Sequence, residues 1–267
     1  MRNKETRPGG PRSYDLLGSI AVVNADAGTA KAMAKAIMLS HPRVKTVLRR
    51  GGAVSGRFRT RRHVYVAGKR NYVADYRENG CEFRFDVRKS FFSPRLAFER
   101  QRVSAMSKPG ETIIVMFAGV GPFAIEAAKA QGSSRVIAIE LNRNAVSEMK
   151  RNIEINKARN VEAVLGDVHK EAGRYKGAAD RIVMPLPASA FRFLPDAFKM
   201  AKASCTLHYY SFVESGSGAE AELSRIRRLA LKSGRRVKLL GMRTARTYSA
   251  SEIEVVLDIK VSRIPAR

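Results

Sequence analysis

The sequence predicts an α/β protein in which a mostly parallel sheet, ending in an antiparallel hairpin, follows a small basic α+β domain. Three observations support this fold class. From Gly110 onward, apolar strand-like runs alternate with amphipathic helical segments, the pattern of a parallel sheet covered on both faces. The last two strand-like runs have no helix between them, so the final strand should return antiparallel. Residues before 90 carry shorter strand-like runs separated by glycine and arginine.

The composition is that of a globular protein without membrane spans. The chain has 267 residues, 45% of them hydrophobic, enough to bury a core in one large or two small domains. Its most apolar stretch, residues 112–128, contains two glycines, a proline and a glutamate, so it falls short of the roughly 18 apolar residues of a membrane helix. The basic N-terminus has no apolar stretch behind it and is not a secretory signal. We therefore expect a cytoplasmic protein, and nothing in the sequence requires more than a monomer.

Cysteine and histidine do not indicate a metal site. Cys81 and Cys205 lie far apart, and the four histidines lack the short spacing of metal ligands. We expect no metal.

The charge of the chain is strongly positive. Fifty lysines and arginines stand against 24 aspartates and glutamates, a formal net charge of +26. Residues 43–77 hold eleven basic residues and one acid, Asp75, whereas residues 110–190 are closer to balance. A basic block beside a balanced segment favours a nucleic-acid-binding domain next to a chemical site. A basic surface without a polyanionic partner is the alternative.

The N-terminal part is expected to contain a disordered segment over residues 1–16 and the small basic α+β domain over residues 17–89. The segment is rich in glycine and proline. Residues 28–40 place Ala, Met and Ile on one helical face. Strands are expected at residues 19–24, 44–50, 63–68, 71–77 and 81–89.

The remaining residues, 90–267, are expected to form a Rossmann-like sheet of the class I methyltransferase type. Expected strands are residues 112–117, 135–140, 161–167, 180–187, 205–212, 235–242 and 252–261. Expected helices are residues 122–131, 144–156, 188–202 and 218–232. A parallel sheet with one terminal antiparallel hairpin has the shape of that fold.

The glycine-rich turn "GVGPFA" follows the first of these strands. Gly119 and Gly121 allow a tight turn and a close approach of a ligand, and Pro122 suits the first turn of the following helix. Glu140 ends the next strand, where a carboxylate can accept hydrogen bonds from a ribose diol. Nicotinamide dinucleotides and S-adenosylmethionine share that diol, so these residues leave both cofactors open.

Two later features favour S-adenosylmethionine. Asp167 ends the third strand, where it can accept a hydrogen bond from an adenine amino group, and "MPLP" ends the fourth. Ligands of open α/β sheets lie outside the carboxyl ends of the strands, so Asp167 and Pro187 should meet the turn and Glu140 there. A dehydrogenase gives no reason for a proline-bearing loop in a chain of this charge.

Five motifs in order identify a family resemblance. The segments "FFSPRLAFERQRV", "GETIIVMFAGVGPFAIEAAK", "IAIELNRNAVSEMKRNIEIN", "GD" and "ADRIVMPLPASAFRFL" resemble the archaeal and eukaryotic tRNA (guanine-37-N1)-methyltransferases. The similarity runs from about Tyr14 to the C-terminus. It implies methyl transfer from S-adenosylmethionine to N1 of the guanosine beside the anticodon, with the basic domain holding the anticodon stem-loop of the tRNA.

The resemblance supplies candidate site residues. We expect the cofactor at Phe117, Gly119, Gly121, Pro122, Glu140, Leu141, Asp167, Val168 and Pro185. We expect the tRNA at Arg59, Arg61, Arg95, Arg100 and Ser189. The catalytic candidates are Glu99, Arg70 and Pro187.

The chemistry needs a base, because guanine N1 carries a proton at neutral pH. Glu99 is the candidate base. Glu111 is the rival carboxylate, but it starts the first strand, at the end opposite the expected site. The alternative for Glu99 is a structural pair with Arg95 or Arg102. Arg95 and Arg70 could offset charge on the guanine O6 or contact phosphate.

The chain departs from the family pattern at two positions and in its length. Val115 stands where the family usually has Asp, and Pro185 where it has Asn. The additional N-terminal domain of many archaeal members is expected to be absent. A related aminocarboxypropyl transferase and a noncatalytic RNA-binding protein remain alternatives. The first has His-Leu in place of Pro122-Phe123, lacks the arginine of "SPR", and has Gly-Tyr near Pro185-Leu186.

Overall fold

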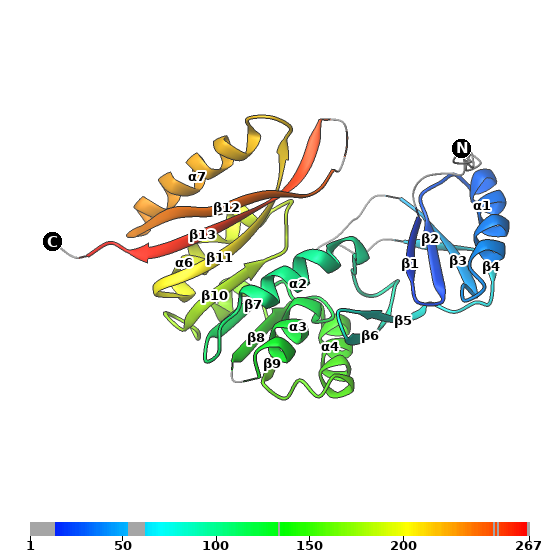
Figure 1. Cartoon of the computed structure of the whole chain (residues 1–267), viewed down its shortest axis with the longest axis horizontal. Coiled ribbons are helices and arrows are strands. Elements are labelled where there is room, and N and C mark those ends of the chain that lie inside the picture. Colours follow the sequence, from blue (N-terminus) through cyan, green and yellow to red (C-terminus); the bar gives the residue numbers. More distant parts are fainter. Residues whose placement is uncertain (1–13, 53–61, 133, 248, 250, 266–267) are drawn as a thin grey trace, which may run out of the picture. The chain divides into compact units, whose positions relative to one another are not determined.

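The computed structural model describes residues 14–52, 62–132, 134–247, 249 and 251–265 (Figure 1). The chain divides into two compact units, Met1–Pro94 and Arg95–Arg267. Residues 1–13 of the expected disordered segment lie outside the described residues. Tyr14–Leu17 form strand β1, so residues 14–16 differ from that expectation because they pair with a neighbouring strand.

The first unit combines a four-stranded sheet, one helix and a separate hairpin. The sheet has the order β1-β2-β3-β4, with β2 (Ile20–Val23), β3 (Thr46–Arg50) and β4 (His63–Gly68). Helix α1 (Ala27–Ser40) begins after Asp26, whose carboxylate accepts the N–H groups of Gly28 and Thr29. Its buried face is the expected one, formed by Ala30, Met33, Ala34 and Ile37. The hairpin pairs β5 (Val73–Glu78) with β6 (Cys81–Asp86).

The second unit is built on a seven-stranded sheet of order β12-β13-β11-β10-β7-β8-β9. Its strands are β7 (Thr112–Met116), β8 (Arg135–Glu140), β9 (Val161–Leu165), β10 (Ala179–Met184), β11 (Ala201–Glu214), β12 (Arg235–Thr247) and β13 (Glu252–Arg263). Strands β7 to β11 are parallel. Strand β13 lies between β11 and β12 and is antiparallel to both. The predicted fold class, including the terminal antiparallel hairpin, is confirmed.

Helices cover this sheet on both faces (Figure 1). Helices α5 (Val168–Glu171), α6 (Leu194–Met200) and α7 (Gly218–Lys232) enclose the main apolar core, which includes Ile114, Ile182 and Leu207. Helices α2 (Ala97–Met106), α3 (Pro122–Ala130) and α4 (Arg143–Ile155) lie on the other face. Because successive strand residues point to opposite faces, His208 and Asp258 project toward the face that carries α2.

Several segments differ from the sequence prediction. The short helix α5 was not expected, and β10 ends at Met184 where the sequence predicted a strand up to Pro187. Helix α2 and the short helix η1 (Pro94–Leu96) before it were not expected. The helix expected at residues 188–202 is shorter, since η2 (Ala190–Phe193) and α6 end at Met200 and β11 begins at Ala201. Ala201 is extended and pairs with Ala179 of β10, so strand pairing overrides the helical preference of the local sequence.

Candidate active site

The glycine turn connects β7 to α3 through left-handed backbone. Phe117, Gly119 and Gly121 all have positive φ, and the φ of Gly121 is +90°. A Cβ on Gly121 would lie 2.8 Å from Cγ of Met149. Backbone conformation and close packing therefore both require glycine here, and Pro122 begins α3 directly afterwards.

Glu140 joins the end of β8 to this turn. Its Oε2 accepts the N–H of Gly119 at 2.8 Å, and its Oε1 accepts the N–H of Asn142 at 2.7 Å. Burial raises the pKa of Glu140, against the opposing effect of these N–H donors. A carboxylate oxygen has more than one acceptor site, so both oxygens can still accept from a diol. Leu141, directly after it, is half-buried.

The ends of β9 and β10 bring the other cofactor candidates to the same edge of the sheet. Asp167 follows β9 and caps α5 by accepting the N–H of His169 at 3.0 Å. The Val168 side chain is buried in the main core. After β10, Pro185 and Pro187 are half-buried in a compact loop, held where the N–H of Leu186 donates to the carbonyl of Met184. Ser189 lies half-buried just before η2.

An aromatic stack that the sequence analysis missed adjoins the turn. The Phe117 ring meets Phe193 edge to face at 4.7 Å, and His169 stacks on Phe193 at 4.5 Å. Nδ1 of His169 lies 2.6 Å from the Asp196 carboxylate. The stack therefore connects the segments that follow β7, β9 and β10, which are expected to meet at one ligand.

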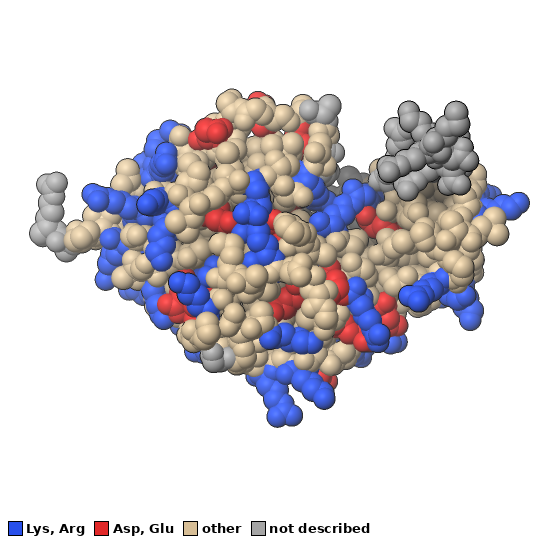
Figure 2. Space-filling view, in the orientation of Figure 1, with Lys and Arg blue, Asp and Glu red and all other residues tan. Residues whose placement is uncertain are grey.

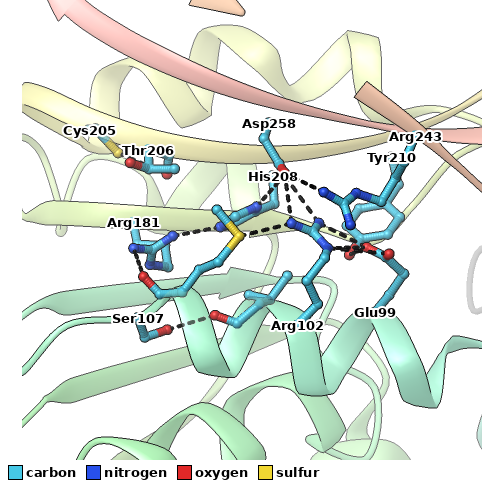
Figure 3. A network of polar contacts seen from close by, with 12 residues as sticks. Glu99, Arg102, Ser107, Arg181, Cys205, Thr206, His208, Tyr210, Arg243 and Asp258 are labelled. Atoms are coloured by element: carbon cyan, nitrogen blue, oxygen red, sulfur yellow. Dashed lines mark hydrogen bonds and ion pairs between the residues drawn. The ribbon is translucent and has the colours of Figure 1, made fainter. Parts of the chain in front are cut away.

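Glu99 lies in a buried polar network between α2 and the sheet (Figure 3). The residue is 3% exposed. Its Oε2 accepts hydrogen bonds from Nε and Nη2 of Arg102, at 3.0 and 2.9 Å, and from the Tyr210 hydroxyl at 3.3 Å. Burial raises the pKa of Tyr210 well above its ordinary value, so the phenol stays protonated and donates. Glu99 thus forms the structural pair with Arg102 that the sequence analysis gave as an alternative.

The network continues from Arg102 into the sheet (Figure 3). Nη1 of Arg102 donates to Oδ2 of Asp258 at 2.7 Å, and Oδ1 of Asp258 lies 2.6 Å from Nδ1 of His208. Nε2 of His208 lies 2.7 Å from Nη1 of Arg181. Arginine only donates, so Nε2 must accept and Nδ1 must carry the proton that it donates to Asp258. His208 is therefore neutral, and burial lowers its pKa.

The charged groups of the network stabilise one another. Burial opposes the ionisation of Asp258, but hydrogen bonds from His208 and Arg102 outweigh it and lower the pKa of Asp258 to about 2. Burial would also lower the pKa of Arg102, but hydrogen bonds to Glu99 and Asp258 raise it above its ordinary value. Both groups therefore stay ionised at neutral pH.

The two candidate bases, Glu99 and Glu111, lie at opposite ends of this network. Glu111 directly precedes β7 and pairs with Arg181 at 2.8 Å, at the amino end of the strands. Glu99 instead contacts Tyr210, whose ring meets Phe123 edge to face at 5.8 Å. Phe123 is the second residue of α3, so this contact links Glu99 to the glycine turn.

Three of the predicted site arginines lie within the described residues, namely Arg70, Arg95 and Arg100. The Arg100 side chain is only 2% exposed, lies 3.5 Å from Glu126 of α3 and packs on the Phe123 ring. That position gives it a role in joining α2 to α3, and the RNA contact expected of it stays a prediction. Arg95 is exposed on η1. Arg70, in the first unit, is exposed and covers the Tyr65 ring.

The remaining expectations concern two arginines, membrane spans and metal ions. Arg59 and Arg61 fall outside the described residues. Within the residues that the structure describes, no helix is long and apolar enough to cross a membrane, and no group of three or more His, Cys, Asp and Glu could hold a metal ion.

Comparisons with known proteins agree on one family. Residues 74–240 match the TRM5/TYW2 methyltransferase domain. The chain is 39% identical to tRNA (guanine(37)-N(1))-methyltransferase Trm5b of Pyrococcus abyssi, across 94% of this chain and 76% of that protein, whose crystal structure matches with a TM-score of 0.85. It is 34% identical to tRNA 4-demethylwyosine(37)-methyltransferase Taw21 of Saccharolobus solfataricus, across 86% and 85%. M. jannaschii TYW2 in complex with AdoMet is 26% identical, across 94% and 100%, with a TM-score of 0.75.

Gly121→Ala should weaken cofactor binding. The new Cβ meets Met149 and forces left-handed backbone on alanine, so we expect the affinity for S-adenosylmethionine to fall on the order of tenfold or more in calorimetry. Gly177→Ala is the matched control, because its φ is +64° but its Cβ would meet nothing within 4 Å. Unchanged affinity in Gly121→Ala would exclude this turn as the cofactor site.

Asp258→Asn should flatten the acid dependence of stability. The folded-state pKa of Asp258 is depressed, so its ionisation stabilises the fold above its unfolded pKa, and this contribution is lost as the pH falls from about 4 to about 2. We expect the wild-type melting temperature to fall more steeply than that of the variant from about pH 4 to about pH 2, with a constant difference near neutrality. Parallel melting curves throughout would contradict the ionised network.

Proposed function

Because the chain belongs to the TRM5/TYW2 methyltransferase family, we propose that it methylates N1 of guanosine 37 of tRNA with S-adenosylmethionine as methyl donor. The observation that carries this proposal is the position of Glu99. Its carboxylate is buried on α2 and linked through Tyr210 and Phe123 to the glycine turn.

The turn and the strand ends fit the cofactor. The left-handed backbone of Gly119 and Gly121 forms a tight turn at the start of α3, where a ligand can approach the main chain. Glu140 would accept hydrogen bonds from the ribose hydroxyls, and Asp167 would accept one from the adenine amino group. The other residues around the adenine would be Phe117, Leu141, Val168 and Pro185. Bound S-adenosylmethionine supplies an electrophilic methyl group.

Residues around Glu99 would complete the reaction. Glu99 would accept the N1 proton of guanine, which leaves an electron pair on N1 for the new bond to the methyl carbon. The bond from that carbon to sulfur would break, and S-adenosylhomocysteine would leave. Arg95, exposed on the helix before Glu99, would offset the charge that develops on O6. Arg70 of the first unit is the other candidate for this role or for a phosphate contact. Pro187 and Ser189, in the loop after β10, would border the target base.

The rest of the proposal concerns the partner. The basic unit, with Arg59 and Arg61, would contact the phosphates of the anticodon stem-loop. We expect the enzyme to act as a monomer in the cytoplasm. Its affinity for tRNA should then fall steeply with salt concentration.

An aminocarboxypropyl transfer from the same cofactor is the second candidate within this family. Three features of the sequence weigh against it, namely Pro122-Phe123, Arg95 and Pro185-Leu186. The products differ in mass, so nucleoside mass spectrometry of the modified tRNA separates the two reactions. The same assay on tRNA with 4-demethylwyosine at position 37 tests the substrate that gives Taw21 its name.

Glu99→Gln should abolish most of the activity. With transcripts that carry G or A at position 37, we expect wild-type enzyme to form N1-methylguanosine only on G37. The variant should be slower by about 10² to 10⁴-fold in single turnover, because glutamine cannot accept the proton. Glu222→Gln on α7 is the control, since Glu222 is also buried, also pairs with an arginine three residues later and also accepts from a tyrosine. A Glu99→Gln rate equal to wild type would reject Glu99 as the base.

A further inference from the structure

Two adjacent tyrosines of β11 make the same contact on opposite faces of the sheet. The Tyr210 hydroxyl donates to Glu99 of α2, and the Tyr209 hydroxyl donates to Glu222 of α7 at 2.5 Å. Each glutamate is buried and pairs with an arginine three residues later, Arg102 or Arg225. The two helices therefore carry matched Glu-Arg pairs. A comparison of the two pairs shows which contacts only Glu99 and Arg102 have.

The difference lies in the arginine. The Arg225 side chain is 52% exposed, whereas that of Arg102 is 10% exposed. Arg102 presents one side of its guanidinium to Glu99 and donates from Nη1 and Nη2 to Asp258 of β13, at 2.7 and 3.2 Å. A planar guanidinium that is held by two carboxylates has one orientation available to it. The Glu99 carboxylate is therefore fixed relative to the sheet as well as to its own helix.

Asp258 is itself held from the opposite side. Neutral His208 donates to it, and Arg181 donates to His208 and also to the carbonyl of Met106 at 2.6 Å. Met106 is the last residue of α2. The contacts thus form a closed path that holds both ends of α2. A second proton on His208 would lie on Nε2 and point at the positive guanidinium of Arg181, which disfavours it. The path therefore keeps the same hydrogen bonds across neutral pH.

We propose that Arg102 is a positioning residue for methyl transfer: it orients the Glu99 carboxylate, and Asp258 and His208 fix Arg102. This inference rests on the proposed role of Glu99 as base. Arg102 acts through Glu99 alone, so its loss should slow the chemical step and leave the binding of tRNA and S-adenosylmethionine unchanged.

A double-mutant cycle tests the proposal. We expect Arg102→Met to reduce the single-turnover rate at saturating substrates by about 10- to 100-fold, with both dissociation constants within about twofold of wild type. Arg102→Lys keeps the charge without the planar fork and should recover part of the rate. In a Glu99→Gln background, Arg102→Met should have no further effect, because both changes remove the same function. Arg225→Met is the matched control and should keep the wild-type rate.

The outcomes separate the two proposals. If Arg102→Met reacts at the wild-type rate while Glu99→Gln is inactive, Arg102 has no positioning role, but Glu99 can still be the base. Multiplicative losses in the double variant also overturn the positioning role. A Glu99→Gln enzyme at the wild-type rate overturns both. If Arg102→Met melts below the assay temperature, Arg102→Lys or Asp258→Asn replaces it in the double-mutant cycle. Each of these variants should reduce the single-turnover rate less than Arg102→Met, and neither should reduce it further in the Glu99→Gln background.

Discussion

The orientation of the Glu99 carboxylate on helix α2 depends on the buried ion pair between Arg102 and Asp258, which is one of several polar contacts that hold the helix. Four residues of α2 are buried, and only one of them, Val103, is apolar. The helix therefore cannot be held mainly by apolar packing. A buried charge without a partner costs several kcal/mol, so the helix must occupy the one position in which its charged groups are satisfied. Polar contacts give α2 a defined position where apolar packing would permit sliding.

Strand topology places the partner of that ion pair. Strand β13 is inserted antiparallel between β11 and β12, and its register puts Asp258 directly opposite His208. Arg102 and Asp258 are 156 residues apart in the chain. Strand β13, the last in the chain, thus completes the surroundings of Glu99, which precedes the first strand of the same sheet, β7.

The sequence predicted the parts of the fold that follow local rules. Apolar strands, the glycine turn and the terminal hairpin have periodicities or turn residues of their own, and Glu140 ends its strand where expected. Helix α2 escaped prediction because Glu99 and Arg100, both charged, occupy its buried face, which destroys the apolar period. The burial of Arg100 was not foreseen for the same reason, since a charged residue is expected at the surface.

The network itself left a weak signal in the sequence. Arg181, His208 and Asp258 each interrupt an apolar strand. Each alone is compatible with a solvent-facing position, and only the register shows that they share one face and meet. Register depends on long-range pairing, which local patterns do not determine. The stack of His169 on Phe193 was missed for a similar reason, because it joins two connecting segments.

The length of α2 explains why two similar carboxylates serve different ends of the sheet. The helix starts near the carboxyl ends of the strands, where Glu99 contacts Tyr210, and ends where the Met106 carbonyl accepts from Arg181. Arg181 also binds Glu111, so that carboxylate is occupied in anchoring the far end of the helix. Ligands of such sheets bind at the carboxyl ends of the strands, so only Glu99 is placed to meet one. Glu111 would contribute to the proposed reaction indirectly, by fixing the helix that carries Glu99.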